Sequence, residues 1–269
     1  MNDWLDRVGS VLVLSAHADD CEYFCGGLMA TLAARGASIV EVIATDNGRG
    51  SFELAPGELI SRSREIEAAE AARIIGKKHV EFLGYPDGFL DDTPKNELRR
   101  IFIEWIRRVK PDLVLSFDVR DFDAHPDHRM VARAASEAAV FSHLPLFHAE
   151  QVEAGLAPHM TPYRLWFDAK DGSAGFVFDI GKVIPVKVQA LLAHQSQMRL
   201  AMTEWKMMLG GCGGFPELAA IIDTDDQSKA IELLVTAWGS ACAAGRDFEY
   251  GEAFRLEFAD GIFRDFVEG

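Results

Sequence analysis

Short apolar segments alternate with longer amphipathic segments along the first half of the chain. The first apolar segment, residues 11–16, is continuous, which is typical of a strand buried on both faces of a parallel sheet. The same pattern predicts strands at 11–16, 38–44, 79–83 and 112–117. Helical spacing of apolar residues predicts helices at 22–35, 58–76, about 95–109 and after Pro126. This alternation through about residue 141 indicates a Rossmann-like α/β fold, with a mostly parallel sheet flanked by helices.

The segment 58–76 is the longest of these predicted helices. Its apolar residues at helical spacing are Ile60, Ile66, Ala69, Ala72 and Ile75. Gly76 follows them, and glycine readily adopts the left-handed conformation that ends a helix. We therefore expect one long amphipathic helix whose apolar face carries these residues.

The second half of the chain is less regular. Residues 142–163 are rich in proline, histidine and aromatic residues. Beyond them we predict strands at 164–168 and 175–179, and helices at 182–201 and 226–243 that close the chain. Because no repeat or low-complexity linker interrupts the sequence, we expect a single domain over residues 1–269. Its core lies at about 8–141 and its C-terminal helix and strand extension at about 142–269.

Composition narrows the class of protein. The formal charge of −15 at pH 7 repels nucleic-acid phosphates and anionic membrane surfaces, so we expect neither as a partner. No window approaches the run of about 20 apolar residues that a membrane helix needs, and Asp3 and Asp6 interrupt any signal-peptide pattern. These features favour a cytoplasmic protein. Its few scattered cysteines favour reduced thiols, with Cys21 and Cys25 packed on a helix.

Two clusters of chemically competent residues follow predicted strands. His17, Asp19 and Asp20 come directly after the strand at 11–16, and the loop 118–128 after the fourth strand ends in a second such cluster. In open α/β sheets, ligands bind outside the carboxyl ends of strands, near the point where strand order reverses. If the first and fourth strands are neighbours, the two clusters meet at one site.

The residue types in these clusters suit a metal-dependent hydrolase. His17, Asp20 and His128 provide two imidazoles and one carboxylate, a ligand set of hydrolytic zinc sites that keep a position open for water. Asp19, flanked by ligands, suits the general base for that water, and His125 suits a donor to the developing oxyanion. Taken singly, each motif is more often a helix cap, and Asp127 alternatively caps a helix or orients His128.

The same residues resemble a known family, the PIG-L/LmbE-like N-acetylglucosaminyl deacetylases. His17-Ala18-Asp19-Asp20 followed by Gly26-Gly27 resembles the first family motif, with Ala18 in place of the usual proline, and Ala124–His128 resembles the second. Softer matches are Thr45–Gly50, which lacks a glutamate often found there, Arg64-Glu65, Tyr85–Gly88, Ala193–Gln197 and Glu252–Arg255. Among family members, the chain is similar to the diacetylchitobiose deacetylase branch, which forms hexamers built from trimers.

This resemblance implies specific roles. It implies one Zn²⁺ per chain held by His17, Asp20 and His128, with Asp19 as general base and His125 as oxyanion stabiliser. It also implies sugar contacts by Arg64, Asp87, Asn47 and Arg49. His194, together with Ser196 and Gln197, is a further candidate for the pocket lining, although a polar cluster on a helix equally satisfies buried backbone groups or caps a helix end. The implied function is zinc-dependent removal of the acetyl group from an N-acetylglucosamine-type sugar by a homo-oligomer, a trimer or hexamer.

Two other functions stay open at this point. One is deacylation of another small N-acyl amide. The other is a non-catalytic metal- or nucleotide-binding regulator, although no Gly-x-Gly-x-x-Gly cradle follows the first strand. His143, His148 and His159 lie in the irregular segment, where they suit a pocket rim, a subunit contact or a structural role. The Gly210–Gly214 run predicts a flexible turn that could act as a lid.

Overall fold

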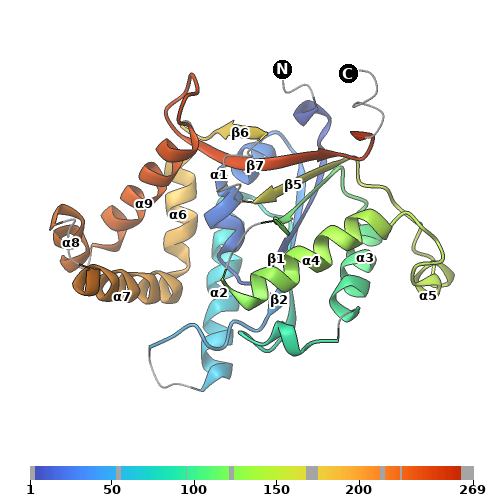
Figure 1. Cartoon of the computed structure of the whole chain (residues 1–269), viewed down its shortest axis with the longest axis horizontal. Helices are drawn as coiled ribbons and strands as arrows, with labels where there is room; N and C mark the ends of the chain where they lie inside the picture. The colour runs from blue at the N-terminus through green and yellow to red at the C-terminus, as the bar shows by residue number, and fades with distance from the viewer. Residues whose placement is uncertain are drawn as a thin grey trace.

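The computed structural model describes residues 4–52, 56–94, 96–120, 124–167, 175–212, 216–224 and 226–261. Within these ranges the chain forms one seven-stranded sheet, in the order β3-β2-β1-β4-β5-β7-β6, with helices packed around it (Figure 1). The strands are β1 Ser10–Ser15, β2 Ser38–Thr45, β3 His79–Tyr85, β4 Leu113–Phe117, β5 Tyr163–Phe167, β6 Phe176–Asp179 and β7 Gly251–Phe258. The predicted Rossmann-like α/β fold is confirmed.

The first strand lies at the centre of this sheet. β1 pairs in parallel with β2 on one side and with β4 on the other, so the strand order reverses at β1. Its residues Val11–Leu14 are fully buried, as expected for a strand covered on both faces. The loops after β1 and β4 therefore leave the same edge of the sheet side by side. This was the condition under which the two predicted clusters meet at one site.

The helices are α1 Asp20–Ala34, α2 Gly57–Ile75, α3 Glu97–Val109, α4 Pro126–Phe141, α5 Ala149–Glu153, α6 Ile184–Ala193, α7 Gln195–Cys212, α8 Pro216–Asp223 and α9 Gln227–Cys242. Two short 3₁₀ helices lie at Leu5–Arg7 and Leu90–Asp92. Gly76 ends α2 with φ of 90°, the left-handed conformation that its sequence predicts. None of the helices in the described ranges is long and apolar enough to cross a membrane.

The predicted apolar face of α2 is partly wrong. Ala72 and Ile75 are buried, but Ile66 is 65% exposed and Ala69 is exposed. The buried face instead carries Arg64, Ala68, Ala71, Ala72 and Ile75. α2 packs against α6, and small alanine side chains allow the two helices to approach closely. A polar residue, Arg64, takes a buried position at the end of this face that lies nearest the predicted site.

Three predictions in the second half of the chain need correction. The helix predicted at 182–201 is two helices, because the backbone leaves the helical conformation at His194, with ψ of 59°. Helices do not close the chain, since β7 follows α9 and pairs with β5 and β6 in antiparallel orientation. Gly210 and Gly211 lie inside α7 rather than in a turn, whereas Gly213 and Gly214 lie outside the described residues.

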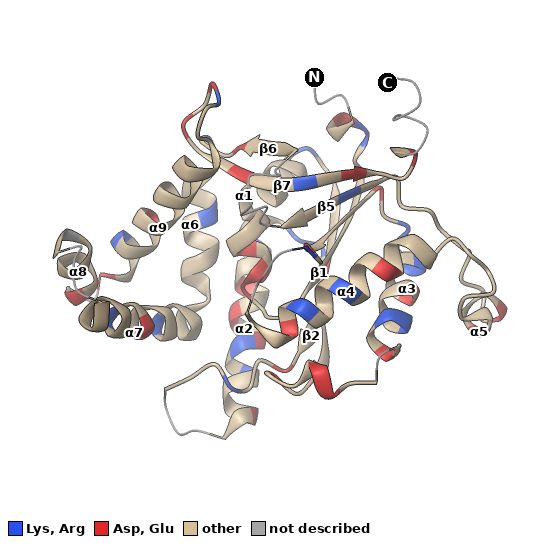
Figure 2. Cartoon of the chain, viewed as in Figure 1, with Lys and Arg blue, Asp and Glu red and all other residues tan. Residues whose placement is uncertain are grey.

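The charges on the chain are spread over many elements. Figure 2 shows acidic and basic residues interleaved along α3 and α4.

Two of the three histidines of the irregular segment contact backbone or side-chain groups of other elements. His159 Nε2 lies 2.8 Å from the Pro111 carbonyl, and the His148 carbonyl accepts a hydrogen bond from Arg107. The His143 side chain has a buried Nδ1 atom without a hydrogen-bond partner among the described residues.

Candidate active site

The loops after β1 and β4 meet at the carboxyl edge of the sheet, where they border a cavity of about 350 Å³. His17 Nδ1 from the first loop lies 3.1 Å from His128 Nε2 in the first turn of α4. The predicted site residues that line the cavity are His17, Asp19, Asp20, Asn47, Arg64, Asp87, His125 and His128. The two clusters, more than 100 positions apart in the sequence, thus converge as the neighbouring strands predict.

Three donor atoms at the floor of this cavity form a triangle. Asp20 Oδ1 lies 3.4 Å from His128 Nε2 and 3.9 Å from His17 Nδ1, and the two nitrogens are 3.1 Å apart. In a tetrahedral zinc site with bonds near 2.0–2.1 Å, neighbouring donors are about 3.3 Å apart. The spacing of these atoms therefore fits one small divalent cation.

Asp20 is held in place by the backbone around it. Its Oδ2 atom accepts hydrogen bonds from Ala16 N at 2.8 Å and from His17 N at 2.7 Å, which leaves Oδ1 directed at the histidines. Burial alone would raise the pKa of Asp20, but the imidazoles of His128 and His17 outweigh burial and lower it. Asp20 is therefore an ionised, fixed donor.

Two other combinations of donors that include His17 are also close enough to hold an ion. Ring nitrogens of His17, His125 and His128 lie within 4.8 Å of one another, and so do a His17 nitrogen and carboxylate oxygens of Asp87 and Asp127. The set of three imidazoles contains no carboxylate. In the set with Asp87, both oxygens of Asp127 already accept backbone N–H groups, whereas Asp20 keeps Oδ1 without such a contact. We therefore favour the set with Asp20.

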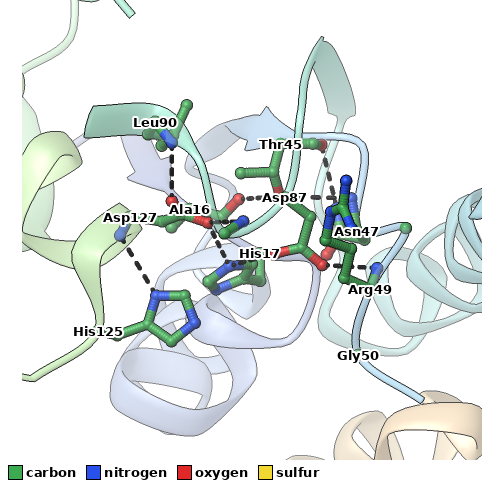
Figure 3. Close-up of polar contacts among 12 residues, drawn as sticks. Ala16, His17, Thr45, Asn47, Arg49, Gly50, Asp87, Leu90, His125 and Asp127 are labelled. Carbon is green, nitrogen blue, oxygen red and sulfur yellow. Dashed lines mark hydrogen bonds and ion pairs between the residues drawn. The ribbon is translucent and has the colours of Figure 1, made fainter. Parts of the chain in front are cut away.

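The second nitrogen of His17 faces two carboxylates. His17 Nε2 lies 3.2 Å from Asp127 Oδ2 and 3.2 Å from Asp87 Oδ1 (Figure 3). Asp127 is fully buried and accepts from Gly88 N at 2.7 Å and Leu90 N at 3.0 Å. An acceptor at Nε2 keeps the proton on that nitrogen, so Nδ1 presents its lone pair to the triangle.

Replacing Asp127 with alanine should weaken zinc binding about 10- to 100-fold, because the His17 ring would lose the carboxylate that fixes its tautomer and orientation. Competition with a chromophoric chelator measures the dissociation constant. Asp112→Asn is the matched control, since Asp112 Oδ2 accepts from Gly9 N and Ser10 N at the opposite end of β1. Unchanged zinc affinity in the Asp127 variant would contradict this role.

Asp19 has the features of a proton acceptor. Its side chain is buried but lines the cavity, and no described residue donates a hydrogen bond to its carboxylate. Burial and the neighbouring Asp20 charge raise the pKa of Asp19, while His194 and Arg64 oppose the rise. A carboxylate with unengaged oxygens and a raised pKa can take a proton from a reactant in the cavity and return it.

His125 has a defined tautomer. Its Nδ1 atom accepts a hydrogen bond from Asp127 N at 3.3 Å, so a neutral ring carries its proton on Nε2 (Figure 3). Burial, together with the neighbouring His17 and His128, lowers the pKa of His125. The neutral ring is therefore a hydrogen-bond donor at the edge of the cavity.

Three of the predicted sugar contacts line the cavity. Arg64 is buried at the cavity, donates to the Gly50 carbonyl at 2.6 Å and also hydrogen-bonds Gln197. Asp87 lines the cavity beside His17 and accepts from Arg49 N at 3.0 Å. Asn47 lines it too, but both ends of its amide bind backbone groups: Oδ1 accepts from Ala18 N, and Nδ2 donates to the Thr45 carbonyl at the end of β2.

Two predicted contacts do not reach the cavity. The Arg49 guanidinium lies 4.7 Å from the centre of the Phe89 ring, outside the lining of this cavity. His194 is fully buried, with Nε2 3.4 Å from Glu22 Oε2, and does not line the cavity either. The geometry therefore does not support a direct substrate contact for either side chain.

One wall of the cavity was predicted only in part, through Gln197. Residues of α1 and α7 complete the lining: Tyr23, Phe24, Gln197, Leu200, Ala201, Glu204 and Trp205. The α7 residues recur three to four positions apart, so they share one helix face, but nothing local to the sequence shows that this face meets the loops of the sheet. The signal available beforehand was the Ala193–Gln197 motif, in which Gln197 rather than His194 reaches the cavity.

Comparison with known proteins identifies the family of this chain. Residues 12–139 match the family model PIG-L, described as GlcNAc-PI de-N-acetylase. The diacetylchitobiose deacetylase of Thermococcus kodakarensis is 32% identical over 201 residues, which cover 73% of each protein. A probable N-acetyl-alpha-D-glucosaminyl L-malate deacetylase 2 of Bacillus anthracis is 29% identical over 203 residues, 73% of this chain and 84% of that protein.

A solved structure shares the fold across almost the whole chain. It is N,N'-diacetylchitobiose deacetylase from Pyrococcus horikoshii complexed with its inhibitor MPG, with a TM-score of 0.77 and 25% identity, covering 98% of this chain and 88% of that one. The sequence match and the fold both extend far beyond the two motifs that carry the predicted metal ligands. This chain therefore belongs to the PIG-L family, described as GlcNAc-PI de-N-acetylase, as those motifs predicted.

Proposed function

We propose that this protein is a zinc-dependent N-deacetylase that removes the acetyl group from an N-acetylglucosamine-type sugar. The observation that carries the proposal is the triangle of His17, Asp20 and His128 donors beside the carboxylate of Asp19, which accepts no hydrogen bond from the described part of the chain, in one cavity. The relatives named above, whose names describe deacetylation of N-acetylated glucosamine compounds, support the substrate class.

His17, Asp20 and His128 would hold one zinc ion. When bound, zinc supplies a Lewis acid that makes water a nucleophile near neutral pH and polarises a carbonyl. The protein's own residues do the rest. Asp19 takes a proton from the attacking water and delivers it to the amide nitrogen as that nitrogen leaves. His125 donates from Nε2 to the carbonyl oxygen as negative charge develops on it.

The chemical balance is that of amide hydrolysis. A bond forms between the water oxygen and the acetyl carbon, and the bond between that carbon and nitrogen breaks. Asp19 ends each turnover as it began, and the products are acetate and a free amino sugar. Arg64 and Asp87, charged groups of opposite sign on the same cavity, suit hydroxyl groups of the sugar, and their contacts fix its orientation.

A substrate panel tests the proposed function. We expect zinc-loaded enzyme to release acetate from at least one of N-acetylglucosamine, its β-linked dimer, or its malate or inositol conjugates. Turnover should lie in the ordinary enzymatic range of about 1 to 10³ per second. Chelator-treated protein is the control. Should every sugar fail while a non-sugar N-acyl amide is hydrolysed, the sugar assignment would be wrong and the alternative amide hydrolase would replace it.

A further inference from the structure

Four ionisable side chains form a continuous chain of buried contacts next to the first turn of α1. Lys77 Nζ lies 2.5 Å from Glu22 Oε1 and 2.5 Å from Glu41 Oε2. On the other side of Glu22, Oε2 lies 3.4 Å from His194 Nε2. Each of these four side chains is at most 1% exposed. Two carboxylates, an ammonium and an imidazole thus share a region that solvent does not reach.

The elements joined by this network also carry the candidate active site. Glu22 lies in the first turn of α1, two residues after Asp20, and Glu41 lies in β2. Ser15, the last residue of β1, donates from Oγ to Glu41 Oε1 at 2.7 Å. The network therefore reaches the strand that leads into His17 as well as the helix that begins with Asp20.

His194 is the member of the network that connects it to the cavity wall. It occupies the break between α6 and α7, and neither of its ring nitrogens makes a hydrogen bond with a described residue, so the 3.4 Å contact of Nε2 with Glu22 Oε2 is an ion-pair contact. Just after it, Ser196 Oγ donates to Glu67 Oε2 of α2 at 2.6 Å, and Gln197 accepts from Arg64 of the same helix. The start of α7 is thereby held to α1 through Glu22 and to α2 through Ser196 and Gln197.

Stability alone gives little reason to keep such a network. Taking charges out of water costs free energy, and apolar side chains of similar volume often stabilise a core as well as a buried ion pair does. Paired charges, in contrast, favour one arrangement of the elements that they join. We propose that His194 is a positioning residue that acts through Glu22 to hold the first turn of α1, with Asp19 and Asp20, against the start of α7.

This inference rests on the proposed deacetylase function only where turnover is the readout. In zinc-saturated enzyme, His194→Leu should lower kcat about 10- to 100-fold, as a displacement of about 1 Å at a catalytic group does, with a smaller change in KM. His194→Gln should recover kcat to within about threefold, because its amide nitrogen can take the place of Nε2 beside the Glu22 carboxylate. His79→Leu is the matched control, since it removes a solvent-exposed histidine–glutamate pair with 3.0 Å between Nε2 and Oε2.

A second readout needs no substrate. Cobalt(II) titration followed by visible absorption reports the coordination geometry, and His194→Leu should change the spectrum while His194→Gln and His79→Leu should not. If the wild-type protein turns over no sugar but His194→Leu still changes the cobalt spectrum, the proposed function would be wrong while the proposed role of His194 would stand. If the leucine variant does not fold, His194→Asn, whose shorter amide does not reach Glu22, takes its place.

A double-mutant cycle tests whether His194 acts through Glu22. The effects of His194→Leu and Glu22→Gln on kcat should be strongly non-additive, because each breaks the same contact. Additive effects would overturn the proposal. So would a His194→Leu enzyme that melts at a lower temperature but keeps its kcat within twofold and its cobalt spectrum unchanged, since His194 would then only stabilise the fold.

Discussion

Asp19→Asn is expected to leave zinc bound and to lower kcat for the best N-acetylated sugar by about 10²- to 10⁴-fold, the usual contribution of a general base. The amide is close to the carboxylate in size, so the cavity should keep its shape, but an amide cannot take the proton of the attacking water. Steady-state kinetics and elemental analysis of the same sample check both halves of this prediction.

The control for this substitution must change a carboxylate without touching the cavity. Asp112→Asn, at the far end of β1, meets that condition. We expect it to retain wild-type kcat even if it melts earlier. An Asp19→Asn enzyme with near wild-type turnover would remove Asp19 from the role of base, and loss of zinc would show that it acts on the metal instead.

Replacing Asp20 with alanine is expected to weaken zinc binding by more than about 100-fold, more than the loss of an orienting partner costs, and to abolish turnover at micromolar zinc. The physical reason is that the triangle of donors would keep only its two imidazoles. Isothermal titration with zinc and acetate-release assays check this outcome. Chelation of the wild-type enzyme should abolish activity in the same way, and added zinc should restore it.

His125→Ala distinguishes the set of donors with Asp20 from the set of three imidazoles. With Asp20 as the third ligand, His125→Ala should keep zinc and lower kcat by about 10²- to 10³-fold through loss of an oxyanion donor. With three imidazoles as ligands, His125→Ala should lose zinc while the Asp20 variant keeps it. The second pattern would overturn the ligand set proposed above.

Much of the site could be predicted because its parts are local in sequence. A buried strand followed at once by His17, Asp19 and Asp20 marks the carboxyl edge of a sheet, and the fourth strand carries a second such cluster to the same edge. Parallel pairing of β1 with β4 was the one assumption needed, and it is confirmed. The single-domain organisation and the homo-oligomer stay predictions.

Long-range packing explains the errors. Period-three to period-four spacing predicted α2, but not which side faces α6, so Ile66 was expected on the apolar face and is exposed. The alternation of Phe254, Leu256 and Phe258 with polar residues was a signal for β7 that a helical interpretation of the C-terminal region overlooked. His194, where the helix ends, contacts Glu22, which is far away in sequence.

The order of residues along the chain was enough to identify the fold class and the family, and to predict which residues bind a metal or move a proton. Strand burial, loop position and side-chain chemistry are encoded over a few neighbouring positions. The folded chain was needed to show that α7 walls the cavity, that Arg49 lies on Phe89, and that His194 faces Glu22. Those contacts join segments far apart in sequence, and their geometry follows from the packing of whole helices against the sheet, which no local pattern specifies.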